Sequence, residues 1–360
     1  MALSCTGLSS PLLWRTHAST EEARLAFPQR LPAHALSGRP GRGRCALAPP
    51  PRRRICSLRC LRPTRRRAEL LLVAAQKAPK RVQQKPGAAS WRLLELAPYL
   101  VRWEVPWGAP TVALGLGGWA ASFLFSGAIL APLLAGLCGV NVRELAGTQQ
   151  TEYVAALQSL ETFQGLAIIW LCTRKYQPLP DGLFRLDSSR PLSPEGGWLA
   201  WSGLFYLACF PAIGAAAGLT SLLSEAQAVQ DQGAGTVDAI LPLISSDALS
   251  FASLLAVTGV LAPVLEEVVF RGFLLVSLSK WMPAPAAVLA SSTLFAAAHF
   301  APRDAPQLLA LGLVLGFSYV RTRNLLVPVV VHGLWNSGVL VALTVLSSQG
   351  TDLQQALRGP

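Results

Sequence analysis

Seven long apolar runs, separated by short segments with charges and prolines, dominate the chain from residue 109 onward. About 20 consecutive apolar residues form a helix that crosses the hydrocarbon core of a bilayer. The pattern therefore predicts an all-α fold, a polytopic integral membrane bundle of about seven (six to eight) transmembrane helices, the sixth of them short. The runs lie at about residues 109–138, 153–173, 198–222, 249–279, 284–301, 307–320 and 324–347.

Tryptophans stand at the edges of these runs. Amphipathic indole rings prefer the headgroup region of a bilayer, so we expect these residues at the membrane–water interface. They are Trp103, Trp107, Trp198, Trp201 and Trp281.

Composition agrees with a membrane protein, because 52% of the 360 residues are hydrophobic and only 14% are charged. The net charge of +12 is unevenly placed: residues 1–92 hold 19 Lys/Arg and 3 Asp/Glu, whereas residues 93–360 hold 12 and 16. The membrane body has no basic patch to bind a phosphate backbone. We therefore expect the lipid bilayer, and no nucleic acid, as a partner.

The N-terminal quarter is rich in Arg and Pro and has acidic residues only at Glu21, Glu22 and Glu69. This composition is typical of a cleaved organelle transit peptide, which we place at residues 1–75. The alternative is a retained basic tail on the membrane surface. A start rich in Ser, Thr and Pro favours a plastid (chloroplast) membrane, with the mitochondrial inner membrane as the second choice.

The remaining chain divides into a linker or juxtamembrane segment at 76–105, a membrane domain at 106–350 and a C-terminal tail at 351–360. Basic residues alternate between its loops: residues 174–197 hold four Lys/Arg and residues 223–247 hold none. By the positive-inside rule, the N-terminus and the richer loops face the stroma or its equivalent.

The spacing of the cysteines does not indicate a set of disulfide bonds or a metal site. Four lie in the predicted transit peptide and three are isolated in apolar runs, so neither a disulfide network nor a zinc ribbon is expected. They are Cys5, Cys45, Cys56 and Cys60, and then Cys138, Cys172 and Cys209.

Three charges interrupt the fourth apolar run, at Glu266, Glu267 and Arg271. One charge at the centre of a membrane helix costs about 2.5–3.5 kcal/mol, so a group of three indicates a functional site. Glu267 and Arg271 are four residues apart and share a helix face, where the arginine can neutralise the carboxylate. Glu266 is rotated by about 100° and stays the less compensated acid, suited to act as a general base.

Only two histidines follow the predicted transit peptide, His299 and His332, and both are embedded in apolar sequence. Asn336 lies four residues after His332 on the same helix face, and Gly333 permits a close approach of backbones. The amide of Asn336, assisted by His332, can donate a hydrogen bond to a developing oxyanion. Phe295 lies four residues before His299, where it would form a wall beside the ring.

The residues of the last two paragraphs form three short sequence motifs, called blocks below. Together, these blocks resemble the CPBP family of intramembrane proteases, also called Abi or CAAX-protease-like, which includes the type II CAAX prenyl endoproteases. The resemblance covers about residues 249–345. It implies a helical membrane fold with a catalytic cavity inside the bilayer, in which Glu266 and His299 activate water, His332 and Asn336 stabilise the oxyanion, and Glu267 and Arg271 support them. The blocks are Glu266-Glu267-x-x-x-Arg271, Phe295-x-x-x-His299 and His332-x-x-x-Asn336.

A zinc site is the alternative, with Glu266, His299 and His332 as ligands and an open position for water. The sequence has no His-Glu-x-x-His, which favours a metal-free glutamate mechanism without a cofactor.

One geometric difficulty concerns Glu266 and His299. If residues 249–279 and 284–301 cross as simple antiparallel spans, His299 approaches the membrane face opposite to Glu266. A helix break after Arg271, which Gly272 would permit, would bring the two level. A separation above roughly 8 Å would rule out a water shared by both.

The sequence therefore predicts an intramembrane endopeptidase that acts on a membrane-protein or prenylated-protein substrate. The alternative is a non-proteolytic plastid membrane scaffold that stabilises or regulates thylakoid or envelope enzymes. A proton-coupled transporter is disfavoured, because the chain has no inverted halves.

Overall fold

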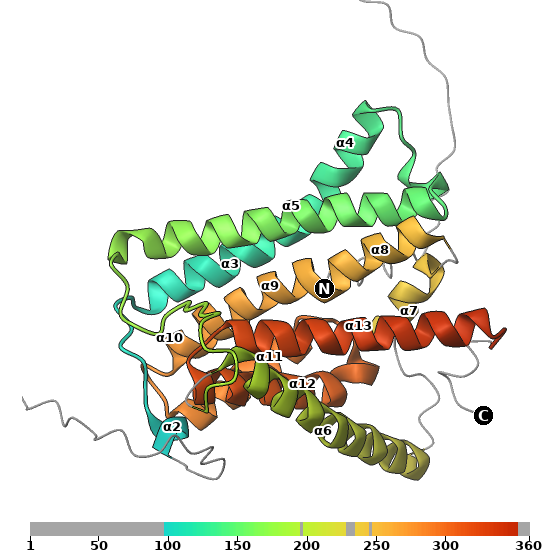
Figure 1. Cartoon of the computed structure of the whole chain (residues 1–360). Helices are drawn as coiled ribbons and strands as arrows, with labels where there is room; N and C mark the ends of the chain where they lie inside the picture. Colours follow the sequence, from blue (N-terminus) through green and yellow to red (C-terminus); the bar gives the residue numbers. More distant parts are fainter. Residues whose placement is uncertain (1–96, 195–196, 228–234, 245–246, 352–360) are drawn as a thin grey trace, which may run out of the picture. The chain divides into compact units, whose positions relative to one another are not determined.

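The computed structural model describes residues 97–194, 197–227, 235–244 and 247–351, and every regular element in these residues is helical. The predicted transit peptide, most of the linker and nearly all of the C-terminal tail lie outside the described residues. The α-helices (Figure 1) are α2 (Ala97–Leu100), α3 (Ala109–Phe125), α4 (Ala131–Leu137), α5 (Thr148–Thr173), α6 (Trp198–Gln227), α7 (Thr236–Ile240), α8 (Ala248–Ala256), α9 (Ala262–Glu267), α10 (Val276–Leu278), α11 (Ala284–Ala297), α12 (Ala305–Thr322) and α13 (Leu326–Ser348).

Each of the seven predicted runs is helical. Among the described residues, five helical segments are long and apolar enough to cross a membrane, and α11 is a shorter apolar helix. The five are Ala109–Leu137, Thr148–Tyr176, Trp198–Leu222, Ala248–Leu278 and Leu326–Ser348. The protein is thus an all-helical, multi-pass membrane bundle, as predicted.

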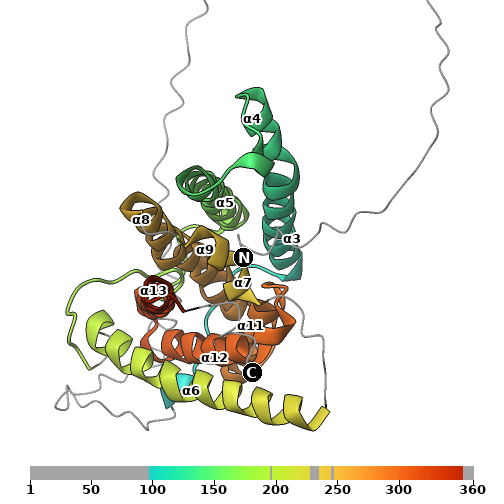
Figure 2. The same cartoon turned by 90° about the vertical axis from the view of Figure 1, so that its right-hand side faces the viewer.

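The fourth of these segments is one helix with changes of winding. Between α8 and α9 it passes through the π-helical segment η6 (Val257–Leu261), and between α9 and α10 through η7 (Val268–Leu275). Such π segments are frequent at functional sites, because they leave backbone carbonyls without their usual helical partners. In Figure 2, α9 lies between α5 and α13, and it packs against both. The two adjacent glutamates at its end are therefore central to the bundle.

Three of the five tryptophans are buried among protein side chains, and their depth relative to the membrane stays a prediction. Trp103, Trp107 and Trp201 are at most 5% exposed. The Trp107 indole donates a 2.7 Å hydrogen bond to the Ser277 hydroxyl and stacks on Phe273 with ring centroids 5.7 Å apart. A buried indole N–H needs a partner, and these rings find theirs within the protein rather than at the headgroups.

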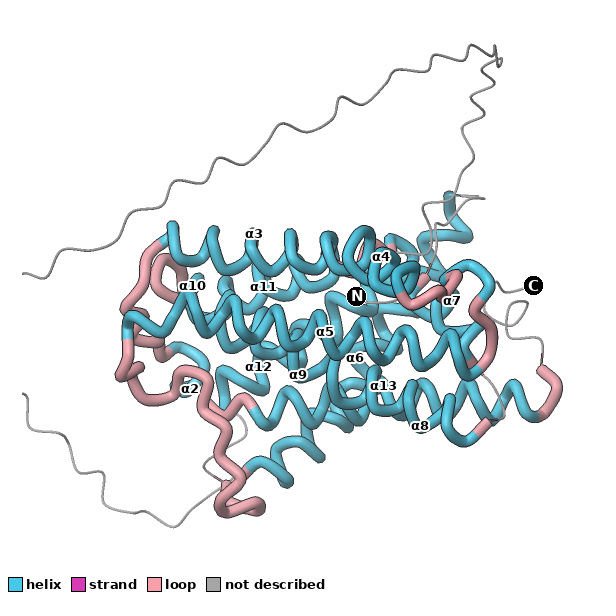
Figure 3. The backbone as a smooth tube through the Cα atoms, turned by 90° about the horizontal axis from the view of Figure 1, so that it is seen from above, coloured by secondary structure: helices cyan, strands magenta, loops and turns pink. Residues whose placement is uncertain are grey.

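The loops that join α5 to α6 and α10 to α11 lie at the same end of the helices as the segment before α3 (Figure 3). Lys280 Nζ donates to the carbonyl oxygen of Val105 at 3.1 Å, and Leu325 N donates to that of Arg185 at 2.8 Å. The guanidinium of Arg323 lies 3.6 Å from the ring centroid of Trp103. This placement agrees with the predicted alternation of the loops; the membrane side that this end faces stays a prediction.

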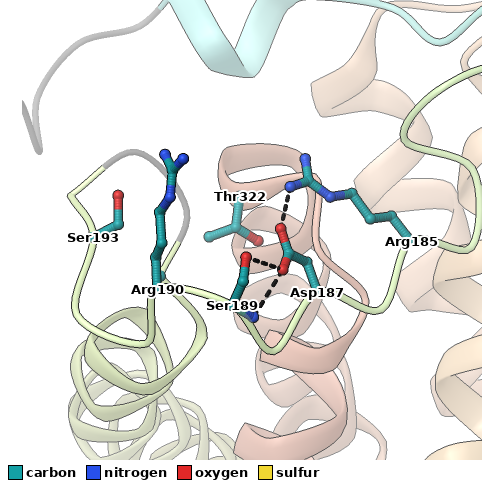
Figure 4. Close-up of a pocket in the computed structure, with 7 residues that line it drawn as sticks. Arg185, Asp187, Ser189, Arg190, Ser193 and Thr322 are labelled. Atoms are coloured by element: carbon teal, nitrogen blue, oxygen red, sulfur yellow. Dashed lines mark hydrogen bonds and ion pairs between the residues drawn. The ribbon is translucent and has the colours of Figure 1, made fainter.

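The loop between α5 and α6 contains a polar hollow of about 390 Å³ at the same end (Figure 4). Asp187 accepts hydrogen bonds from Ser189 and Arg185, which lower the pKa of its carboxyl group to about 2. Asn324 holds the Asp187 backbone through hydrogen bonds of 2.7 and 3.0 Å. None of the predicted site residues lines this hollow, and its hydrogen bonds serve to fasten the loop to the α12–α13 turn.

Candidate active site

The ion pair predicted from spacing is present. Arg271 Nη1 donates to Glu267 Oε1 at 2.7 Å, and both side chains are fully buried. Arg271 Nη2 donates to the carbonyl oxygen of Gly312 on α12 at 3.2 Å, and the guanidinium lies 4.5 Å from the ring centroid of Phe295. A buried charge needs a partner and hydrogen bonds in addition, and Arg271 obtains them from three different helical segments.

His332 on α13 extends this network. Its Nδ1 atom lies 2.9 Å from Glu267 Oε1, so the carboxylate of Glu267 faces both Arg271 and His332. Its Nε2 atom lies 3.9 Å from Oε2 of Glu266. The sequence did not predict the contact between Glu267 and His332, because it joins residues 65 positions apart.

His299 follows the end of α11, and its Nε2 atom lies 3.8 Å from Glu266 Oε2. The expected separation of Glu266 and His299 is therefore not found. The reason is that the two helical segments, or arms, that connect these residues to the turn between α10 and α11 have similar lengths. Glu266 lies 12 residues before the end of α10 at Leu278, and His299 lies 15 residues after the start of α11 at Ala284. At 1.5 Å per residue the two arms are similar in length, so a simple hairpin brings both residues level.

No helix break at Gly272 contributes to this proximity, because the chain continues through η7 into α10. A Cβ atom at Gly272 would lie 2.7 Å from the ring of Phe184 and 3.3 Å from Leu325. The absent side chain thus permits packing of the neighbouring loops.

Phe295 is fully buried and lies between the other side chains. Its ring packs edge to face against His299 and His332, with centroids 4.7 and 5.7 Å apart. The expected wall beside His299 is thus present, and it contacts the second histidine and Arg271 as well.

Asn336 on α13 faces the π segment η6. Its Nδ2 atom donates to the carbonyl oxygen of Thr258 at 3.1 Å. The expected close approach at Gly333 is confirmed: a Cβ atom there would lie 2.3 Å from the carbonyl oxygen of Gly259. Pro263 explains part of this arrangement, because proline has no N–H to bond the carbonyl four residues earlier, which is that of Gly259. The second N–H of the Asn336 amide remains available to a ligand.

A cavity of about 290 Å³ divides the predicted site residues into two groups. Glu266, His299, His332 and Asn336 line it, whereas Glu267, Arg271 and Phe295 lie behind them. The first group can contact a substrate, and the second can orient the first. Further lining residues include Gln158, Ile213, Ile240, Thr258, Gln307, Leu308, Leu311, Trp335, Val339 and Leu340.

The arrangement does not form a metal site in the described part of the chain, where no three His, Cys, Asp or Glu side chains are placed to hold a metal ion. Nδ1 of His332 faces Glu267 and Nδ1 of His299 faces a backbone carbonyl. The remaining Nε2 atoms lie 3.8 and 3.9 Å from Glu266, where they can contact a water molecule bound to the carboxylate.

The region that contains the candidate site matches a known protein family. Residues 248–338 match the family described as Rce1-like, type II CAAX prenyl endopeptidase Rce1-like. The match begins with α8 and ends within α13, and it includes all three sequence blocks. This segment of the chain is therefore similar to Rce1-like domains. Comparison with curated proteins gave no match to the chain, and neither did comparison with solved structures.

Sequence reasoning missed several groups around the site. The Gly312 carbonyl and the Thr258 carbonyl are backbone acceptors, which no side-chain pattern reveals. Gln158 and Glu161 are buried polar residues in the apolar α5, at most 3% exposed. Their polarity within a membrane helix was a signal that could have directed attention to this helix.

Proposed function

We propose that this protein is an intramembrane endopeptidase that hydrolyses a peptide bond of a membrane-associated protein. The observation that carries the proposal is the cavity in which Glu266 lies opposite two histidine rings, with the Asn336 amide in the same wall. A polar cluster that served only folding would need no cavity beside it. The similarity to Rce1-like domains supports the same class of reaction.

Glu266 and His299 are proposed to activate water. The Nδ1 atom of His299 lies 2.7 Å from the carbonyl oxygen of Phe295, which can only accept a hydrogen bond, so Nδ1 carries the proton. Nε2 of the neutral ring is then an acceptor directed at the Glu266 side. The gap of 3.8 Å exceeds a direct hydrogen bond and is short enough for one water molecule to contact both atoms.

His332 and Asn336 are proposed to stabilise the oxyanion. Nδ1 of His332 lies 2.9 Å from the Glu267 carboxylate, which can accept a hydrogen bond from it and fix the orientation of the ring. In the reaction as proposed, Nε2 of this ring donates as well. This N–H and the second N–H of Asn336 are preorganised donors for the negative charge that develops on the carbonyl oxygen.

In the proposed reaction, the water oxygen attacks the carbonyl carbon while its proton passes to Glu266, with His299 orienting the water. The tetrahedral oxyanion is held by His332 and Asn336. The C–N bond then breaks, and Glu266 returns the proton to the departing amine. Water is consumed, and a carboxylic acid and an amine are released, which in water become a carboxylate and an ammonium group.

The test compares membranes of cells that lack the protein after they are supplied with the wild type, Glu266→Gln or the matched control Glu152→Gln, an exposed glutamate on α5. Mass spectrometry of protein termini should find new termini with the wild type and with Glu152→Gln, and none with Glu266→Gln. The same termini with Glu266→Gln would contradict the mechanism. No new termini with any variant, together with partner proteins that fall in abundance when the protein is absent, would favour the scaffold.

The same experiment addresses the substrate. A prenylated protein tail is the substrate class that the family description names, and a membrane protein without a lipid is the alternative. The position of the new termini distinguishes them, since cleavage of a prenylated tail generates a terminus directly after the modified cysteine.

For the location, we propose a plastid membrane, on the composition of residues 1–75, with the mitochondrial inner membrane as the alternative. Import of the radiolabelled full chain into isolated chloroplasts and into mitochondria tests this proposal. Protease-protected product of reduced size in chloroplasts alone is expected, and such product in mitochondria alone would contradict it.

A further inference from the structure

Two glutamine side chains lie in the wall of the active-site cavity, outside the three sequence blocks. Gln158 belongs to α5 and is 2% exposed, and Gln307 belongs to the first turn of α12. Helix α5 lies outside the region that matches the Rce1-like family, so the family match does not assign a role to Gln158. Both residues share the cavity with Glu266 and Asn336.

The hydrogen-bonding capacity of these amides is only partly used. Gln158 Nε2 lies 3.4 Å from the Thr162 hydroxyl. Within the described part of the chain, Oε1 of Gln158 and Oε1 of Gln307 are buried atoms without a hydrogen-bond partner. Buried polar atoms are nearly always paired, and an unpaired one at a cavity wall indicates a ligand or ordered water.

The hydrogen-bonding groups of the two glutamine amides indicate which class of ligand can bind to them. A primary amide carries a donor and an acceptor, as each non-proline unit of a peptide main chain does, whereas lipid esters and acyl chains offer no donor. Recognition through main-chain hydrogen bonds is the usual way in which proteins hold extended peptides. The remaining wall is largely apolar, including Ile213, Leu311 and Trp335, and can accommodate side chains.

We propose that the amides of Gln158 and Gln307 bind the main chain of an extended substrate peptide and position it for attack at Glu266. Water takes these hydrogen bonds in the unbound protein, and the substrate replaces it. This assignment rests on the proposed endopeptidase function and deepens it, because it names the substrate class as extended polypeptide and assigns positioning residues.

The test measures binding in the full chain with Glu266→Gln, reconstituted in phosphatidylcholine nanodiscs, so that bound peptides are not hydrolysed. A library of random octapeptides is the probe, and captured peptides are identified by mass spectrometry. The tightest peptide is then synthesised in versions that replace one main-chain N–H at a time by an ester oxygen. Fluorescence anisotropy gives each Kd.

Additional Gln158→Met or Gln307→Met should weaken binding about 5- to 50-fold, because each removes an amide at nearly constant volume. The matched control is Gln149→Met, an exposed glutamine on α5, which should change nothing. In the protein that retains Gln158, the ester at one position should weaken binding by the same factor as Gln158→Met does. In the Gln158→Met protein, that ester should not weaken binding further, because both changes remove the same hydrogen bond. If the Gln158→Met protein does not fold, the same affinity measurements with Gln307→Met and the ester series test the proposal.

The inference is overturned if no peptide is captured, if the cavity variants bind like the control, or if the ester and Gln→Met effects simply add. Failure of the proposed function is distinguishable. Captured peptides that the wild type never hydrolyses would contradict the endopeptidase alone, whereas hydrolysis that neither Gln→Met nor ester replacement slows would contradict the glutamine assignment alone.

Discussion

The Nδ1 atom of His332 lies 2.9 Å from Oε1 of Glu267, the same oxygen that accepts a 2.7 Å hydrogen bond from Arg271. This contact links the first and third sequence blocks through one carboxylate. Glu267 therefore connects the arginine, which is buried behind the cavity, to a histidine that lines it. Glu267 can thereby set the orientation of a histidine ring that lines the cavity.

Removing Arg271 should destabilise the bundle strongly. Arg271→Met leaves the carboxylate of Glu267 buried without its cation, which costs about 3–5 kcal/mol. Thermal unfolding in detergent should show a large fall in the midpoint, whereas Arg143→Met, at an exposed position of the 3-10 helix η3 (Val142–Glu144), serves as the control. The double variant Glu267→Gln/Arg271→Met should recover part of the loss. A wild-type midpoint for the single variant would show that the pair is not needed for stability.

The close approach of α13 and η6 should not tolerate a side chain at Gly333. Gly333→Ala places a Cβ atom 2.3 Å from a backbone oxygen, so the two segments must separate, at a cost of about 1–3 kcal/mol. Activity should fall as well, since Asn336 moves away from Thr258. Gly214→Ala is the control, because a Cβ atom there meets nothing within 4 Å. Equal unfolding midpoints for the two variants would contradict the predicted backbone contact.

Asn336 should act on the rate of the chemical step. Asn336→Ala removes one of the proposed oxyanion donors, which typically lowers kcat about 100- to 1,000-fold. KM should change little, because the charge develops only after binding. Initial rates on a cleaved substrate found by terminus mapping would provide both constants. A rise in KM at unchanged kcat would instead assign Asn336 to ground-state binding.

Hydrolysis should not require a metal ion. In purified protein, 1,10-phenanthroline and EDTA should leave the rate unchanged, because Glu266 itself is the proposed base. Loss of activity with phenanthroline but not with its non-chelating 1,7 isomer, followed by recovery with zinc, would show that zinc takes part.

The tryptophans should differ in their contact with lipid. Brominated lipids quench only rings that touch acyl chains, and Trp281 is 49% exposed whereas Trp107 is fully buried. Trp281→Phe should therefore reduce the quenchable fraction of fluorescence, and Trp107→Phe should not. Trp107→Phe should also lower the unfolding midpoint, because Ser277 loses its donor. Strong quenching of Trp107 fluorescence would instead support contact of this ring with lipid at the membrane interface.

The sequence by itself determined the features that depend on local spacing. Long apolar runs specified the helices, since only a helix satisfies its backbone within one segment in lipid. The interval of four residues specified the pair of Glu267 and Arg271, because residues at that spacing share a helix face. The same rule placed Phe295 beside His299.

Only the tertiary structure decided which helices meet. The apolar pattern of a membrane helix surrounds it on all sides, so it does not reveal which face a neighbour covers. The proximity of Glu266 and His299 depends on the lengths of two hairpin arms, and the contact of Glu267 with His332 depends on the path of α13. The burial of Trp107 and the presence of Gln158 in the cavity wall arise in the same way, from packing between segments far apart in the chain.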